Sequence, residues 1–417
     1  MSRIIPFRGS VQGNNMFLSE IGNQHLEYRF LSDIAGFTPD WSEKIRTFLL
    51  DEMMFYMKSN QTNQNEDQAN YNNGLYLSYI DVATARWGGD LYSLQSFSSG
   101  FYLALIKSYI QSNRLDLDAL KMYQNAIDSA DRMNLIASIG DDGDGLLYVR
   151  DYYYQSKRFG EIMSIEGCSI GTMCALGAKE LEQKAQKQKS KSGNFSIYNQ
   201  QQWVQQQLII DRHWELAVRI TETCYRATNK TRTGLPVEKF TLSNLLLDNE
   251  KSDKSSININ NNNNEPYAYF YLRPQLAETY FTLYRLTRQQ KYREYAWKMA
   301  QRIDQYARSP ESNGYAAILD VNADPPELDD YQPPIFLSAT LKYLYLTFVD
   351  DNDDNENEDK KETGNGNFTQ DFLPLNKWIF NSAGHPLPIC GLNVAYPREM
   401  CSKTYSSAKN YETTTRL

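Results

Sequence analysis

Residues 271–306, YLRPQLAETYFTLYRLTRQQKYREYAWKMAQRIDQY, carry the pattern that decides the fold. The stretch opens as a loop and then repeats apolar side chains at the three- and four-residue spacing of a helix, with a polar turn at Gln289 and Gln290. The first run contains Leu276, Tyr280, Leu283 and Tyr284, and the second contains Tyr292, Tyr295, Ala296, Met299, Ile303 and Tyr306. This periodicity predicts two helices packed as a hairpin.

A second pair of helices is predicted near the start of the chain. Leu26, Phe30 and Ile34 recur every four residues, and a Gly-Phe-Thr-Pro break at 36–39 separates them from a further run. That run contains Ile45, Leu49, Met53 and Tyr56. Strand alternation is weak throughout, so the pattern predicts an all-α protein of stacked helical hairpins. Periodicity alone permits any helical toroid or solenoid.

Composition sets broad bounds on the protein. A chain of 417 residues can form one large domain or two ordinary ones, and a hydrophobic fraction of 41% allows a sizeable core. The net charge of −8 argues against a nucleic-acid or anionic-membrane surface. No apolar run is long enough to span a membrane. The first residues, MSRIIPFRGS, lack the apolar segment of a secretory signal peptide.

Three low-complexity segments interrupt the helical pattern. Lys184–Lys191 alternates Lys and Gln, residues 255–264 are rich in Asn, and Asp350–Glu362 is almost wholly acidic. None of them can bury apolar surface, so we predict disordered surface loops. We interpret the segments near 184–201, 251–265 and 350–367 as insertions in one domain, although the Asn run could also be a linker.

Several collinear motifs resemble one enzyme family. The motifs are LSEIGNQHLEYRFL (18–31), GCSIGTMCALGAKEL (167–181), TETCYRATNKTRTGLPVEKF (221–240), YLRPQ (271–275), FLSATLKYLYLTF (336–348) and IFNSAGHPLP (379–388). Together they resemble the class I α-1,2-mannosidases, glycoside hydrolase family 47, in its degradation-enhancing mannosidase-like branch. The resemblance implies an (α/α)7 barrel of stacked hairpins. We expect residues 1–417 to form a single partial domain that lacks the first hairpins.

The resemblance also places the family's catalytic acids on residues that cannot replace them. The family uses carboxyl groups as general acid and general base in an inverting hydrolysis. The positions of these acids are occupied here by Ser99, Gln275, Pro333, Ala339 and Ala383. None of these side chains can exchange a proton as a carboxyl group does near neutral pH. The alignment at Ser99 is weaker than at the other four positions.

Other features of the family's site are retained. Glu27, Arg273 and Glu278 match residues that contact mannose, with a scaffold role as the alternative. Ser382 matches the family's calcium ligand, although it could equally be an ordinary turn residue, and the neighbouring carboxylates are lost. The resemblance therefore implies a calcium cofactor whose binding is weakened or lost.

The resemblance pairs Cys168 with Cys224 as the family's disulfide. It offers no partner for Cys174, Cys390 or Cys401, and Cys174 is expected to be a buried small hydrophobe. Sequons occur at Asn60, Asn194, Asn229 and Asn367. With the disulfide, they favour a glycoprotein of the endoplasmic reticulum lumen.

Two functions follow from the resemblance. The first is a mannosidase-like protein of endoplasmic reticulum glycoprotein quality control and degradation that does not hydrolyse glycans. It would bind high-mannose N-glycans or misfolded glycoproteins, with an oxidoreductase as a candidate partner. The alternative is an active, calcium-dependent exo-α-1,2-mannosidase that trims such glycans with inversion. A fragment without function is the third alternative.

Overall fold

The computed structural model describes residues 15–36, 74–81, 84, 86–139, 145–191, 197–241, 245, 268–349 and 372–401. The chain divides into two compact units. Unit 1 comprises Met1–Ala137, Val149–Glu161 and Met400–Leu417, and unit 2 comprises Ser138–Tyr148 and Ile162–Glu399. The predicted second run of the early helix pair, through Ile45 and Tyr56, lies outside the described residues, as do the predicted loops at 251–265 and 350–367.

Unit 1 combines helices with a five-stranded antiparallel sheet. The helices are α1 (Leu18–Asn23), α2 (His25–Ala35), α5 (Ser99–Gln111) and α6 (Leu117–Arg132). The strands are β1 (Asn15–Phe17), β2 (Leu77–Asp81), β3 (Arg86–Tyr92), β6 (Tyr152–Tyr153) and β7 (Arg158–Phe159), in the order β1-β2-β3-β6-β7. These strands are short, and the pairings of β1 with β2 and of β3 with β6 join segments far apart in the sequence, which explains why alternation did not reveal them.

Helix α2 follows the prediction only in part. Its span agrees with the expected apolar run, and Leu26 is buried. However, Ile34 is 48% exposed, and the buried face instead contains His25, Arg29 and Ser32. Tertiary contacts of these polar side chains therefore override the simple apolar stripe.

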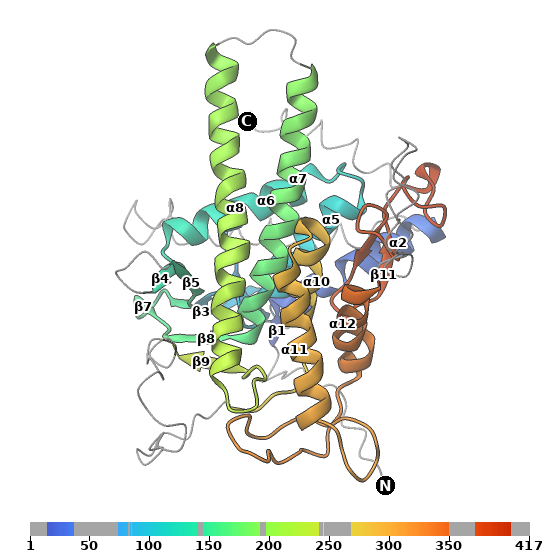
Figure 1. Cartoon of the computed structure of the whole chain (residues 1–417). Helices are drawn as coiled ribbons and strands as arrows, with labels where there is room; N and C mark the ends of the chain where they lie inside the picture. Colours follow the sequence, from blue (N-terminus) through green and yellow to red (C-terminus); the bar gives the residue numbers. More distant parts are fainter. Residues whose placement is uncertain are drawn as a thin grey trace. The chain divides into compact units, whose positions relative to one another are not determined.

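Unit 2 consists mainly of helical hairpins (Figure 1). Its helices are α7 (Ser169–Lys191), α8 (Ile197–Lys230), α10 (Gln275–Thr287), α11 (Gln290–Tyr306), a π-helical turn (Phe336–Thr340) and α12 (Leu341–Phe348). The α10–α11 hairpin confirms the prediction from residues 271–306, because α10 ends at Arg288 in the left-handed conformation and α11 begins at Gln290. Leu276, Tyr280, Tyr292 and Ala296 are buried as expected.

Short β-structure completes unit 2. Strand β8 (Ile162–Ser164) pairs with β9 (Lys239–Thr241), and β10 (Trp378–Phe380) pairs with β11 (Pro386–Pro388). Strand β4 (Ile136–Ile139) pairs with β5 (Leu146–Val149), and most of this ribbon falls within the unit. A 3-10 turn, η1 (Ile165–Cys168), leads from β8 into α7, and a second, η5 (Arg398–Met400), lies near the end of the described chain.

The predicted disorder of Lys184–Lys191 is wrong, because these residues extend α7 (Figure 1). Lys, Gln and Ala all have high helix propensity, so a segment without apolar residues can still be helical. Polar contacts with α8 add support. The amide of Gln206 donates to Gln188 at 3.0 Å, and the Lys189 ammonium lies 5.7 Å from the Trp203 ring centroid.

Candidate functional site

A ladder of backbone hydrogen bonds brings three distant segments of unit 2 together. The pairing of β8 with β9 places Ser164 opposite Lys239. Beyond it, the Ile165 amide donates to the Glu238 carbonyl at 2.9 Å, and the Glu238 amide donates to the Tyr269 carbonyl at 3.1 Å. The chain segments at 165, 238 and 269 therefore lie side by side, and their neighbouring side chains share one site.

Arg273 joins two carboxylates in this site. Its guanidinium donates to Oε2 of Glu238, and its Nη1 lies 3.6 Å from Oε1 of Glu166. The other oxygen of Glu238 accepts from the Tyr271 amide at 3.1 Å. The side chain of Glu238 is 5% exposed, whereas those of Glu166 and Arg273 are 24% and 37% exposed. The cluster thus combines a buried carboxylate, Glu238, with a solvent-accessible cation, Arg273.

Backbone geometry orients Arg273. The preceding residue, Leu272, is buried and has a positive φ of 54°, which is uncommon for a residue with a branched side chain. The Thr340 hydroxyl donates to the Leu272 carbonyl at 2.6 Å. This contact holds the loop before α10 in the conformation that turns Arg273 toward Glu238.

The surroundings of the cluster shift the pKa values of Glu238 and Arg273. Burial raises the pKa of Glu238 to about 7; the Arg273 guanidinium opposes this rise, and Glu166 adds to it. Burial acts to lower the pKa of Arg273, but the carboxylates of Glu238 and Glu166 hold it above its ordinary value. Glu238 is therefore the group in this cluster that changes charge near neutral pH.

Three tyrosines flank the charged cluster. The rings of Tyr269 and Tyr271 lie 4.8 Å apart, and those of Tyr271 and Tyr331 lie 6.1 Å apart in an edge-to-face arrangement. All three residues are half-buried. Burial, then Asp329 and Glu238, raise the pKa of the Tyr271 phenol. Aromatic rings beside hydrogen-bonding side chains can contact both the apolar and the hydroxylated parts of a sugar.

Glu238 and Glu166 were not among the predicted site residues. Glu238 lies in the quoted motif TGLPVEKF, where a lone carboxylate in an apolar context was the available signal. Glu166 carries no local signal, because its role depends on Arg273, which follows more than a hundred residues later. Arg273 itself was predicted, and the structure places it at the centre of the cluster.

Gln275, the first residue of α10, occupies the predicted position of a catalytic acid. Its Oε1 atom is enclosed by protein and accepts no hydrogen bond from any described residue. A buried acceptor without a donor costs roughly 1–3 kcal/mol. An amide does not transfer a proton near neutral pH, and its oxygen here accepts no hydrogen bond from the polar cluster around the neighbouring Arg273.

Replacing Gln275 by methionine is expected to leave the free energy of unfolding unchanged or to raise it by about 1 kcal/mol, because the orphan acceptor disappears while the volume is kept. Gln275→Glu is expected to lower it by roughly 1–3 kcal/mol at neutral pH, because a carboxylate gains no donor there. Urea unfolding of both variants measures the difference. A Gln275→Glu protein more stable than Gln275→Met would contradict this account.

Apolar residues occupy the other three positions of unit 2 at which we predicted the loss of an acid. Pro333 and Ala339 are buried, and Ala383 is half-buried. A Cβ atom added to Gly384 would lie 2.5 Å from the Ser338 carbonyl oxygen and 2.7 Å from the Ala339 Cα. The turn after β10 is therefore packed directly against the π-helical turn, and no described carboxylate enters at these positions.

Glu278, predicted to contact glycan, is buried on α10. Burial and the neighbouring Glu278 carboxylate raise the pKa of the Tyr343 phenol on α12 well above its ordinary value. This position between two packed helices supports the scaffold alternative for Glu278.

The residues around Ser382 do not fit a calcium ion. Ser382 is exposed, and the Lys342 ammonium donates to the Gly384 carbonyl at 2.8 Å. Asn381 Oδ1 is engaged by the amides of Ala383 and His385 at 3.0 and 2.8 Å. A hard dication requires several oxygen ligands with negative charge. Within the described ranges, no group of three or more His, Cys, Asp or Glu residues could hold a metal.

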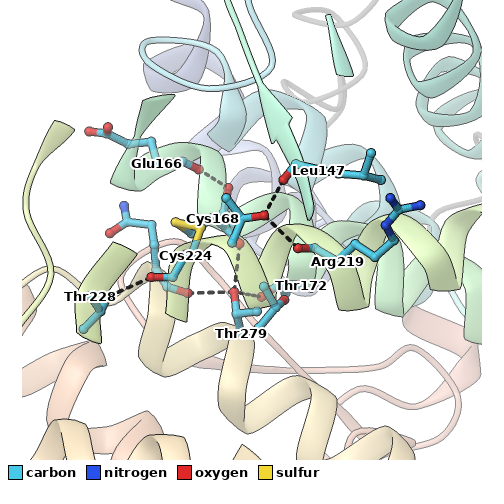
Figure 2. Close-up of a disulfide and its surroundings, with 12 residues drawn as sticks. Leu147, Glu166, Cys168, Thr172, Arg219, Cys224, Thr228 and Thr279 are labelled. Atoms are coloured by element: carbon cyan, nitrogen blue, oxygen red, sulfur yellow. Dashed lines mark hydrogen bonds between the residues drawn. A yellow bond between two sulfur atoms is a disulfide. The ribbon is translucent and has the colours of Figure 1, made fainter. Parts of the chain in front are cut away.

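The predicted disulfide between Cys168 and Cys224 is confirmed (Figure 2). It joins η1 to α8, and both cysteines are buried. Thr279 on α10 donates to the Cys168 carbonyl at 3.1 Å and lies 3.0 Å from the Thr172 hydroxyl. Cys168 follows Glu166 in the same 3-10 turn, so the disulfide anchors the turn that carries Glu166.

The remaining cysteines differ from one another. Cys174 is buried and forms no disulfide, in agreement with the expected buried small hydrophobe. Cys390 and Cys401 are each disulfide-bonded, which sequence analysis did not predict.

Two predicted site residues belong to unit 1. Glu27 is half-buried on α2, and Ser99 is the first residue of α5, where its amide donates to the Gln95 carbonyl at 2.9 Å. Ser99 is thus part of a helix start. Of the sequons, Asn229 is exposed in the last turn of α8, whereas Asn60, Asn194 and Asn367 lie outside the described residues.

None of the described helices combines the length and the apolar character that crossing a bilayer requires.

Comparisons with known proteins agree with this architecture. The chain is 29% identical over 385 residues to mannosyl-oligosaccharide alpha-1,2-mannosidase IA of Spodoptera frugiperda, covering 92% of this chain and 46% of the relative. It is 28% identical over 386 residues to mannosyl-oligosaccharide 1,2-alpha-mannosidase IB of Homo sapiens, covering 92% and 48%. The chain spans about half the length of these relatives.

The fold matches that of a solved mannosidase. An alpha-1,2-mannosidase from Trichoderma reesei superposes with a TM-score of 0.62 at 20% identity, covering 91% of this chain and 67% of that structure. The predicted class, helical hairpins of the (α/α)7 barrel type, is thereby confirmed. The model of glycosyl hydrolase family 47 matches residues 6–389, and the chain therefore belongs to that family.

Proposed function

We propose that this chain binds high-mannose N-glycans through the site around Arg273 and does not hydrolyse them. The proposal depends on one contrast within unit 2: the predicted acid positions are replaced, whereas the arginine of the site is retained. The acid positions hold an amide, a proline and two alanines, while Arg273 keeps a partly exposed guanidinium held by two carboxylates. The names of the relatives, which refer to mannosyl-oligosaccharides, support this class of ligand.

The chemistry of glycoside hydrolysis supports the proposal that this chain does not cleave glycans. An inverting glycosidase needs one acid to protonate the leaving oxygen and one base to activate water. Each such group contributes roughly 10²–10⁴-fold to the rate. A protein without both groups retains only binding and positioning, so turnover should fall far below that of an active relative.

The same site is suited to bind sugars. The guanidinium of Arg273 presents several donors in a fixed fork, which suits neighbouring sugar hydroxyls. Glu166 offers acceptor oxygens, and the half-buried tyrosines supply ring surface. Each charge-assisted hydrogen bond is worth about 1.5–3 kcal/mol, so losing Arg273 should weaken binding at least tenfold.

Isothermal titration with a purified high-mannose N-glycan tests the binding, and a mannose-release assay on the same sample tests the hydrolysis. We expect binding without detectable release. Arg273→Ala should reduce the affinity by roughly tenfold or more. Arg308→Ala, which removes an exposed arginine of the same unit, should leave it unchanged. Mannose release by the unmodified protein would overturn the proposal.

Addition of a chelator is expected to change neither the glycan affinity nor the thermal unfolding midpoint, because the oxygens of Gly384 and Asn381 beside Ser382 are already engaged by the Lys342 ammonium and by backbone amides. Differential scanning calorimetry with EDTA and with added calcium measures this. A calcium-dependent rise in the midpoint would show that the chain holds the ion after all.

One observation favours the alternative of an active exo-α-1,2-mannosidase. Glu238, whose pKa burial raises to about 7, is a carboxyl group that can donate a proton at neutral pH. If mannose is released, Glu238→Gln should abolish the release. Persistence of the activity in that variant would exclude Glu238 as its acid.

We further propose that the protein acts in glycoprotein quality control and degradation in the endoplasmic reticulum lumen, as the resemblance to the degradation-enhancing branch suggests. Its partners would be misfolded glycoproteins and an oxidoreductase. The confirmed disulfide and the exposed sequon at Asn229 are compatible with an oxidising, glycosylating compartment.

A further inference from the structure

We infer that Glu166 is a positioning residue: it retains Arg273 when Glu238 takes up a proton, and the two carboxylates together make glycan engagement by Arg273 depend on pH. The inference rests on the proposed function, because it concerns how the same site is regulated. Glu166 was not among the residues that the family resemblance pointed to.

The geometry gives the two carboxylates unequal roles. Both contact the guanidinium of Arg273, Glu238 through a hydrogen bond and Glu166 at 3.6 Å. Glu238 is almost wholly enclosed, whereas Glu166 remains in contact with solvent. Because burial penalises the charged form, Glu238 becomes neutral more readily than an exposed carboxylate as pH falls.

The surrounding groups determine the pH at which this happens. Burial raises the pKa of Glu238 to about 7, Arg273 opposes the rise, and the negative charge of Glu166 adds to it. The loop before α10 also brings Tyr269 and Tyr271, and Asp329 lies near the Tyr271 phenol. The tyrosines are neutral near pH 7, so Glu166 and Arg273 are the charges in direct contact that set the midpoint.

Protonation of Glu238 changes what Arg273 can do. Above the midpoint, the ionised Glu238 accepts a hydrogen bond from Nε of Arg273, and Glu166 lies 3.6 Å from Nη1, so the Nε donor is not available to a ligand. Below it, Glu238 is neutral and the ion pair with Glu166 remains. The guanidinium then stays oriented while the Nε donor that faced Glu238 becomes available to a sugar hydroxyl. Glycan affinity should therefore rise, by roughly tenfold, as pH falls through the midpoint.

Removal of the Glu166 charge should shift this behaviour. In Glu166→Gln the repulsion that favours neutral Glu238 is lost, so Glu238 should titrate at a lower pH and keep Arg273 occupied across the neutral range. Glu166→Asp retains the charge and should keep the pH profile of the unmodified protein. Glu327→Gln, at an exposed position of the same unit, is the matched control and should change nothing.

The first experiment needs no glycan. Carbon-13 NMR of glutamate carboxyl groups across the pH range follows Glu238 directly, with its signal assigned by its loss in Glu238→Gln. We expect a midpoint near 7 in the unmodified protein and a clearly lower midpoint in Glu166→Gln. An unchanged midpoint in Glu166→Gln would overturn the inference, whatever the glycan result.

The second experiment measures the affinity for a purified high-mannose N-glycan on both sides of the Glu238 midpoint. The inference expects tighter binding below the midpoint in the unmodified protein and in Glu166→Asp, and loss of that difference over the same range in Glu166→Gln. An affinity that is independent of pH would overturn the regulatory role. Absence of glycan binding at every pH, together with the expected NMR shift, would refute the proposed function and leave the coupling of the carboxylates established.

Discussion

Replacing Asp116 by alanine is expected to lower the free energy of unfolding by about 3–5 kcal/mol, the largest effect we foresee for a single residue. Asp116 and Arg29 are each only 1% exposed, and Oδ2 of the aspartate lies 3.6 Å from Nη2 of the arginine. Truncation of one member leaves the opposite charge buried without this partner, which costs far more than the pair contributes when intact.

Asp116 also has two further roles that alanine cannot fill. Its Oδ1 accepts from the Ala119 amide at 3.1 Å and so caps the start of α6, a contact worth about 1 kcal/mol. Its Oδ2 accepts from the Ser108 hydroxyl at 2.8 Å, which in turn lies 3.1 Å from Nε2 of His25. Because Ser108 bridges the other two and all three are buried, this histidine–serine–aspartate group is structural and not a nucleophilic triad.

Asp118 provides the matched control. It lies in the same first turn of α6 but is exposed, so Asp118→Ala should change the free energy of unfolding by less than about 0.5 kcal/mol. Urea unfolding followed by circular dichroism measures both variants. If Asp116→Ala proved no more damaging than Asp118→Ala, the buried ion pair would contribute nothing to stability.

Removal of the Cys168–Cys224 disulfide in a Cys168→Ala, Cys224→Ala double variant is expected to cost about 4 kcal/mol, the value that chain entropy predicts for a loop of this length. The two cysteines are 56 residues apart, and the bond restricts the unfolded chain across most of α7 and α8. The cost should be visible as a lower urea midpoint. Cys174, on the helix that follows Cys168, allows a comparison.

Cys174→Ala removes a buried sulfur from α7 without breaking a disulfide. It should cost about 1 kcal/mol, the scale of a small cavity. A double variant that loses no more stability than Cys174→Ala would mean that the disulfide does not limit the unfolded ensemble. The same result would remove the argument that the bond anchors the turn bearing Glu166.

The long, regular helices were the most predictable part of the fold. The 3.6-residue repeat of 271–306 placed the α10–α11 hairpin and most of its buried face, because each helix buries one continuous stripe. The strands of unit 1 escaped prediction because most are two to five residues long and half of the pairings join distant segments, β1 with β2 and β3 with β6. The helix through Lys184–Lys191 escaped because low hydrophobicity was interpreted as disorder, although its residues are good helix formers.

The site was predictable only where a residue is informative by its own chemistry. Arg273 in YLRPQ and the cysteine pair emerged from motifs, and the predicted loss of acids came from comparing the same motifs with the family pattern. Glu166 and Glu238 gained meaning only when the chain brought them to Arg273. Local sequence cannot reveal burial of a carboxylate by segments far away, and burial is what raises the pKa of Glu238.

The amino-acid sequence by itself determined the family, the helical hairpins and the lack of proton-transferring side chains at five positions, because these depend on residue identity and local periodicity. Only the tertiary structure decided which charges meet: Arg273 with two carboxylates in unit 2, and Arg29 with Asp116 in unit 1. Coulomb and desolvation energies depend on distance and burial in space, and neither quantity can be obtained from spacing along the chain.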